Sequence, residues 1–202
     1  MYKKLSVTFF VMLFLLATQF AWAQSLSNND SKEEAKLTGE KVELPYQTIY
    51  LEGSEDLLFD NGPLVTLPAG GCAGGDASIL DGTLGHTLYG WGHQQNLGNY
   101  MADDFTSSAS WNIDSLKFFA YQTGATAVTI TGVYVQIWNG SPMAGGTIVW
   151  GDLTTNRLQS ATLSNIYRAQ STTPTDCNRR IQTIVATAGV NLPAGQYWVQ
   201  WG

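Results

Sequence analysis

The stretch Val128-Thr-Ile-Thr-Gly-Val-Tyr-Val-Gln-Ile-Trp138 decides the fold class of this chain. It alternates an apolar series with an aromatic and polar one: Val133, Val135 and Ile137 against Tyr134, Gln136 and Trp138. Successive side chains of a β-strand point to opposite faces of its sheet, so we expect a strand with the apolar series in the core. Asn139-Gly-Ser-Pro142 supplies the turn that follows it.

The same strand-and-turn pattern fills the chain from Asp60 onward. Runs of Val, Ile, Thr, Tyr, Phe and Trp recur between Gly, Asn, Ser and Pro, and intervening helical segments are missing. We expect further strands at residues 111–121, with a change of phase near Ser115, and at 147–150, 165–169, 181–187 and 196–201. The sequence therefore predicts an all-β protein, an antiparallel β-sandwich of the jelly-roll type.

The composition supports this class and disfavours others. Charged residues make up only 13% of the 202 residues, against about 25% in an average globular protein. A helical bundle or coiled coil would need many more charged residues. The formal net charge of −6 disfavours a basic surface, so we expect no nucleic-acid partner.

The N-terminus has the features of a secretory signal peptide over residues 1–23. Lys3 and Lys4 precede an apolar run from Val7 to Ala17, and Ala21-Trp-Ala23 is a small-x-small cleavage site. The run is short for a membrane span, which makes an uncleaved anchor the weaker alternative. We expect a secreted or cell-surface protein that does not insert into a membrane after cleavage.

The exported chain divides into two zones. Residues 24–57 are polar and acidic, with few apolar positions, and are expected to form a flexible leader in which Leu44 to Leu51 could pair as an edge strand. Residues 58–202 form the predicted sandwich. Its last strand stops one residue before the C-terminus, so we expect the chain to be a fragment of a longer protein.

The two cysteines, Cys72 and Cys177, suit an oxidising compartment. Both lie in turn-like surroundings, and an exported protein can keep a disulfide. A bond between them would close a loop of 177 − 72 = 105 positions. We expect this bond, with two free thiols as the alternative.

A series of short motifs carries a resemblance to a known family. They are LFDNGP at 58–63, GGDASIL at 74–80, ADDFT at 102–106, FFAYQTG at 118–124, VQIW at 135–138, GDLTTNR at 151–157, IYR at 166–168 and LPAGQYW at 192–198. Together they resemble secreted, flavobacterial-type β-sandwich proteins of uncharacterised activity. Members often carry a C-terminal sorting domain for type IX secretion. The resemblance implies a location and a fold more than a function.

Four oxygen-bearing residues are candidate calcium ligands: Asp103, Asp104, Asp152 and Asn156. Calcium prefers several oxygen ligands, but no Asp-x-Asp-x-Asp-Gly loop is present. The alternative roles are turn caps and ion pairs, with Arg157 or Arg168 as partner. Apart from this calcium alternative, we expect no cofactor.

Aromatic residues give the stronger argument for binding. Sugar rings stack on exposed aromatic faces, whereas most aromatic side chains of a small domain fill its core. Trp138, Trp91 and Tyr134 are the candidates for exposed rings. Trp138 ranks first because it follows the polar face of its strand and adjoins the turn at Asn139.

These observations favour a non-catalytic exported module that binds a glycan, a surface polymer or a protein partner, in adhesion or in an accessory role. One alternative is a secreted hydrolase that uses Asp103 or Asp104 with Asp152. The sandwich region contains no Glu for a carboxylate pair and no Gly-x-Ser-x-Gly motif. The other alternative is a structural spacer within a larger surface protein.

Overall fold

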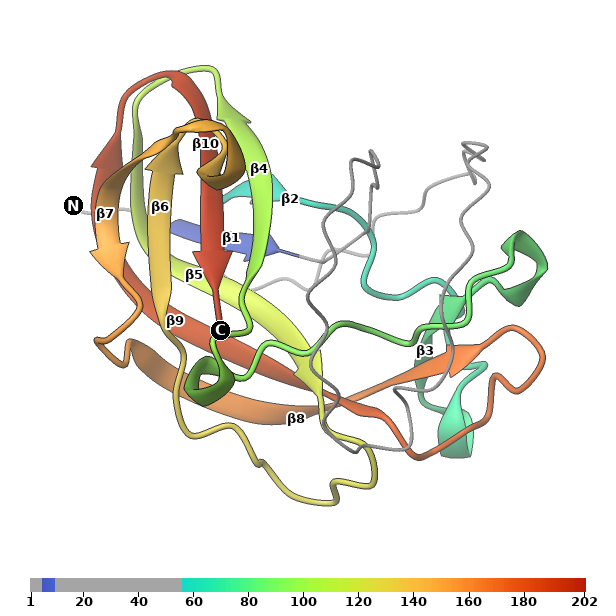
Figure 1. Ribbon diagram of the computed structural model, residues 1–202. Helices are drawn as coiled ribbons and strands as arrows, with labels where there is room; N and C mark the ends of the chain where they lie inside the picture. Colours follow the sequence, from blue (N-terminus) through green and yellow to red (C-terminus); the bar gives the residue numbers. More distant parts are fainter. Residues whose placement is uncertain (1–4, 10–55) are drawn as a thin grey trace.

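The alternating segments form two β-sheets that pack face to face (Figure 1). The structure is a computed structural model and describes residues 5–9 and 56–202. The prediction of an all-β sandwich is confirmed. In the described part of the chain, no helix has the length and apolarity needed to cross a membrane.

The larger sheet, sheet A, has six strands. In spatial order they are β2 (Asp56–Asp60), β1 (Leu5–Phe9), β5 (Trp111–Tyr121), β9 (Arg180–Leu192), β8 (Leu158–Gln170) and β3 (Asp76–Leu80). The central β5–β9–β8 pairs are antiparallel. Strand β1 runs parallel to both of its neighbours, and β3 runs parallel to β8.

The smaller sheet, sheet B, has four strands and is antiparallel throughout. Its spatial order is β4 (Met101–Ser107), β10 (Gly195–Trp201), β6 (Val135–Asn139) and β7 (Thr147–Asp152). Short 3-10 turns interrupt the described loops: η1 (Cys72–Gly74), η2 (Gly82–Leu84), η3 (Gln95–Leu97) and η4 (Pro142–Ala144).

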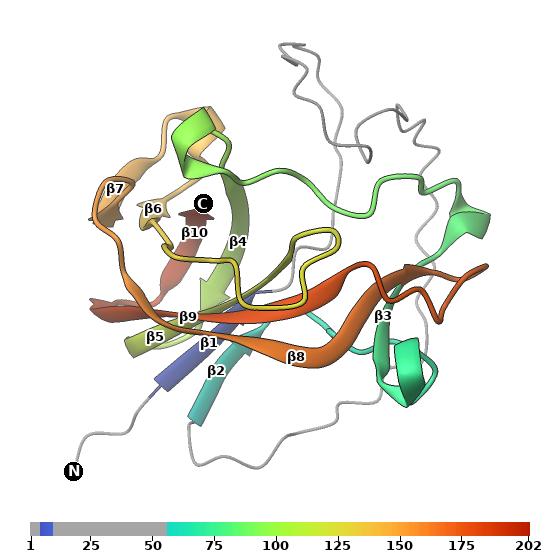
Figure 2. The ribbon, with the colours of Figure 1, turned by 90° about the horizontal axis from the view of Figure 1, so that it is seen from below.

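The hydrophobic core lies between the two sheets, where Figure 2 shows sheet B stacked on β5 and β9. Sheet A contributes Leu116, Phe118 and Ile184, each no more than 1% exposed. Sheet B contributes Phe105, Val135, Ile137, Tyr197, Val199 and Trp201, and the loop before β6 adds Val133. The ring of Phe118 stacks on that of Trp201 at 4.4 Å between centroids. The core series predicted in the opening stretch, Val133, Val135 and Ile137, is confirmed.

The predicted strand boundaries are only partly right. β5 covers Trp111–Tyr121, and its pairing shifts between Ile113 and Ser115, where the phase change was predicted. The strand predicted at 128–138 begins only at Val135. Backbone groups before it bind side chains instead: Thr129 donates its N–H to Gln182 Oε1, and Val133 donates its N–H to Asn156 Oδ1. Side-chain oxygens thus accept the backbone hydrogen bonds that a neighbouring strand would otherwise accept.

The strands predicted at 165–169 and 181–187 are the ends of much longer ones. β8 and β9 each span 13 residues. The early part of β8 that pairs with β9 is polar and small, as in Ser160, Ala161 and Thr162, so the sequence lacks a strong apolar signal there. β3 and its parallel pairing with β8 were not predicted at all.

Strand β1 falls inside the segment predicted as a signal peptide. It lies between β2 and β5 in sheet A and is hydrogen-bonded to both. Cleavage after Ala23 would remove β1 and leave those two strands without the strand between them. The cleavage site, most of the 24–57 leader and the Leu44–Leu51 strand lie outside the described residues.

The predicted disulfide is confirmed. Cys72 and Cys177 are bonded, with their Cα atoms 5.0 Å apart. The bond joins η1, just before β3, to the loop between β8 and β9. It therefore ties the β3 end of sheet A to a segment more than a hundred residues away in sequence.

Candidate functional site

The face of sheet B that points away from the core carries the candidate binding site. Phe105, Val135 and Ile137 point into the core, and alternation sends the residues between them to the other side. We call this side the outer face of sheet B. Its members on β4, β6 and β10 are Ala102, Asp104, Thr106, Gln136, Trp138, Gln196, Trp198 and Gln200.

Two tryptophans lie side by side on the outer face of sheet B. Trp138 of β6 is directly opposite Trp198 of β10 in the antiparallel register. Both are partly exposed. Cross-strand partners of this kind have Cβ atoms about 5 Å apart. The pair thus presents two large aromatic side chains on one surface.

A glutamine network fixes Trp138 in place. Its Nε1–H donates to Gln200 Oε1 at 3.0 Å, and Gln136 Nε2 donates to the same oxygen at 2.7 Å. Gln136 is only 6% exposed. Within the described residues, the Nε2 group of Gln200 makes no hydrogen bond, so it can donate to a ligand.

Trp198, Gln136 and Gln200 were not among the predicted site residues. The alternation at 128–138 already places Gln136 opposite the core series, and the signal for the other two was also present in the sequence. Tyr197, Val199 and Trp201 alternate as an apolar series, and the residues between them must occupy the opposite face. What the sequence could not supply was the pairing of β6 with β10, which places Trp198 next to Trp138.

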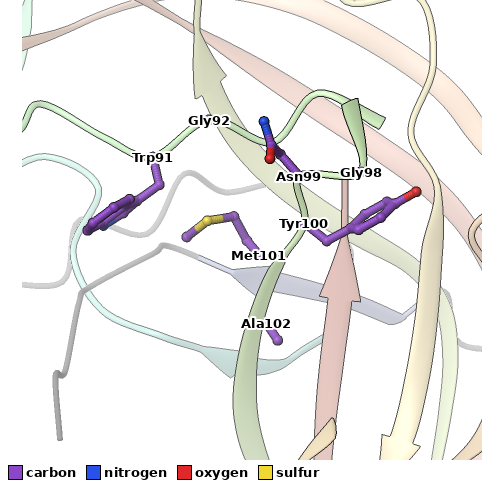
Figure 3. A pocket seen from close by; sticks show the side chains of 7 residues that line it. All are labelled: Trp91, Gly92, Gly98, Asn99, Tyr100, Met101 and Ala102. Carbon is purple, nitrogen blue, oxygen red and sulfur yellow. The ribbon is translucent and has the colours of Figure 1, made fainter. Parts of the chain in front are cut away.

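The second predicted aromatic residue, Trp91, lies at a shallow recess of about 430 Å³. Trp91 is 47% exposed, and Met101 and Ala102 at the start of β4 line the same recess. In Figure 3, Trp91 and Met101 point into one space, on the side of β4 away from β10. Tyr100 points in the other direction.

The loop that carries Trp91 is held at both ends. Arg168 on β8 donates its Nε–H to the carbonyl of Tyr89 at 3.0 Å. Two residues after Trp91, the ring of His93 packs against that of Trp201, with the centroids 4.5 Å apart and the planes tilted by 47°. His93 Nδ1 lies 3.1 Å from the Trp91 carbonyl oxygen. Burial lowers the pKa of the His93 imidazole. The exposed ring therefore sits on a fixed backbone.

The third predicted aromatic residue, Tyr134, lies just before β6 and is partly exposed. Its backbone N–H and carbonyl both pair with Gly202 at 2.9 and 3.0 Å. This continues the β6–β10 ladder by one pair, which places Tyr134 in line with the outer face of sheet B. The structure thus brings Tyr134 and Trp138 to one surface and places Trp91 at the neighbouring edge.

The predicted calcium ligands do not come together. Asp103 and Asp104 are adjacent on β4, so their side chains leave opposite faces. Asp103 accepts a hydrogen bond from Asn61 Nδ2, and desolvation raises the pKa of its carboxyl group. Asp104 accepts from Gln196 Nε2 at 3.0 Å.

Asp152 and Asn156 serve the turn after β7. Asp152 Oδ1 accepts from the N–H of Thr154 and of Thr155, and its Oδ2 pairs with Arg157 at 3.1 Å. Hydrogen bonds, that from the Thr154 hydroxyl first, hold the pKa of Asp152 well below its usual range. Asn156 Oδ1 accepts from the N–H of Val133 and of Leu158. In the described ranges, no three His, Cys, Asp or Glu side chains form a group that could hold a metal ion.

The carboxylate pair of the hydrolase alternative is also apart. β10 and β6 lie between β4, which carries Asp103 and Asp104, and β7, which ends at Asp152. Three strand spacings amount to about 14 Å, whereas carboxylates that cleave glycosides together lie within about 10 Å of each other.

Comparison with protein-family models, curated proteins and solved structures returns no significant match for this chain.

Proposed function

We propose that this protein is an exported, non-catalytic β-sandwich module that binds a glycan chain through the outer face of sheet B. The observation that carries the proposal is the Trp138–Trp198 pair, with Trp138 fixed by Gln200. Aromatic faces stack on the C–H faces of sugar rings, and nearby amide groups exchange hydrogen bonds with hydroxyl groups. A fixed ring loses little entropy on binding.

Export to a cell surface or to the medium is part of this proposal. It is supported by the signal-peptide pattern at residues 1–23 and by the resemblance to secreted flavobacterial-type sandwich proteins. The Cys72–Cys177 bond is compatible with an oxidising compartment. A role in adhesion, or as an accessory module of a larger surface protein, fits this location.

Affinity electrophoresis in gels that contain soluble polysaccharides tests the proposal. The panel would hold hydroxyethyl cellulose, glucomannan, xylan, glycol chitin and laminarin. We expect at least one of them to retard the wild-type protein, and Trp138→Ala to migrate as it does in a gel without polysaccharide. Trp138→Phe keeps an aromatic face but loses the bond to Gln200, so intermediate retardation is expected.

Val128→Ala is the matched control, because Val128 is 44% exposed and lies in the loop before β6, away from the outer face of sheet B. Thermal unfolding of each variant shows whether it is folded. Migration of the wild type unchanged in every gel, or equal retardation of Trp138→Ala and wild type, would overturn the proposed function.

A further inference from the structure

The outer face of sheet B and the Trp91 recess share a residue. Ala102 is the register partner of Gln200, and Gln200 is the partner of Gln136, so these three form one row across β4, β10 and β6. Ala102 is exposed and also lines the recess beside Trp91. We infer that both areas form one continuous surface that binds a linear, uncharged polysaccharide of at least three sugar units, an inference that rests on the proposed function.

The chemistry of the row favours an uncharged chain. The outer-face residues on β4, β6 and β10 include no Lys or Arg, and Asp104 is the acidic residue among them. A uronate or sulfated polymer would place its anions near Asp104 without a cation to compensate them. The amides of Gln196 and Gln200 instead match hydroxyl groups, which both donate and accept hydrogen bonds.

The dimensions favour a chain over a single sugar. Trp138 lies on β6, two strand spacings from β4, and Trp91 lies beyond the free edge of β4 (Figure 3). The span is therefore about 15 Å, which is longer than two linked pyranose rings. The surface is shallow and open at the recess, so a chain can leave it there. Trp138 and Trp91 then act as stacking sites for different units of one chain.

The Trp91 ring is placed for this contact rather than for packing. About half of it is solvent-exposed, although the loop backbone on either side is tied down by Arg168 and His93. Leu97, on the same loop, is exposed to the same degree at 48% but does not line the recess. This makes Leu97→Ala a control for any effect of trimming an apolar side chain from the loop.

The test is the dependence of affinity on chain length, measured by calorimetry with the full chain. The probes are cello-, manno- and chito-oligosaccharides of two to six units, with oligogalacturonates of the same lengths as acidic comparators. For the wild type we expect affinity in at least one neutral series to rise up to four units or more. Trp91→Ala should lose about tenfold for the hexamer and keep the affinity for the dimer. Leu97→Ala should match the wild type at every length.

The outcomes separate this inference from the proposed function. If Trp138→Ala abolishes binding but Trp91→Ala binds hexamers like the wild type, the outer face is a glycan site and the continuous surface is refuted. Equal losses for dimer and hexamer in Trp91→Ala would also refute it. Tighter binding of oligogalacturonates than of neutral chains refutes the selection for uncharged polymers. If all four series fail to bind, the inference fails; the proposed function fails with it only when every polysaccharide gel also leaves the wild type unretarded.

Discussion

At the scale of single residues, Gln200 connects stability to binding. Its Oε1 accepts from both Trp138 Nε1 and Gln136 Nε2. One oxygen thus satisfies a buried amide and orients a partly exposed indole. The partner of Gln200 on β4 is Ala102, a side chain too small to cover it. The network is therefore reachable from solvent on the side where a ligand would lie.

Replacing Gln200 by Ala should weaken the fold, because Gln136 Nε2 is then left buried without this partner. We expect a loss of about 1–3 kcal/mol in the free energy of unfolding, measured by urea denaturation. Gln136→Leu removes the stranded donor, so the double variant Gln136→Leu/Gln200→Ala should recover part of the loss. A double variant that loses the sum of both single changes would show that the network contributes nothing.

His93 should make the stability depend on pH. Burial lowers the pKa of its imidazole below 6.5, so the unfolded chain takes up the proton before the folded protein does. The contribution of neutral His93 is complete above pH 6.5 and is lost as the pH falls from there through the lower folded-state pKa. Thermal unfolding between pH 8 and 5 should show this decline, and His93→Gln should flatten it. An unchanged slope in His93→Gln would contradict the assignment.

For single residues, the sequence predicts which side chains are exposed better than it predicts which atoms they bind. Trp138, Trp91 and Tyr134 are found at exposed or partly exposed positions because aromatic residues on a polar face or in a loop have little core to enter. Asp152 Oδ1 binds backbone groups of its own turn, whereas Asn156 Oδ1 binds Leu158 in the turn and also Val133, 23 positions earlier. A sequence pattern cannot separate such a turn from a metal loop, because both place oxygens at the same short spacing.

At the scale of elements, the predicted alternation held wherever one face of a strand met the core. β5 and β10 were predicted within a residue or so, including the phase change in β5. β3 was missed because a strand of five residues at a sheet edge has too few positions for a period. The start of β6 was predicted too early because residues 128–134 have strand-forming side chains, but backbone groups between 129 and 133 bind the side chains of Gln182 and Asn156.

Strand β1 gives a prediction about processing. If the signal peptide is removed after Ala23, the stretch of β5 from Ser115 to Phe118 loses its parallel partner. Hydrogen exchange in a peptide covering 111–121 should then be faster in the secreted chain than in the full chain, because the amides that faced β1 become accessible. A peptide covering β10 is the control. Equal protection of 111–121 in both forms would contradict the expected loss.

At the scale of the whole molecule, the disulfide fixes the β3 end of sheet A. Closing a loop of 105 positions restricts the unfolded chain far more than the folded one. Cys72→Ser/Cys177→Ser should therefore lower the free energy of unfolding by about 4–5 kcal/mol, measured by denaturant unfolding under non-reducing conditions. The outer face of sheet B is remote from the bond in the topology, so the folded double variant should still bind glycans. A variant as stable as the wild type would contradict the expected stabilisation.

The outer face of sheet B is the proposed binding surface. It is tested most directly by recording the indole N–H signals of ¹⁵N-labelled protein during titration with cellohexaose, mannohexaose and chitohexaose. We expect the signals of Trp138, Trp198 and Trp91 to shift with one of these ligands, while that of Trp201, which is 3% exposed in the core, stays in place. Binding that leaves the Trp138 and Trp198 signals unmoved would contradict it.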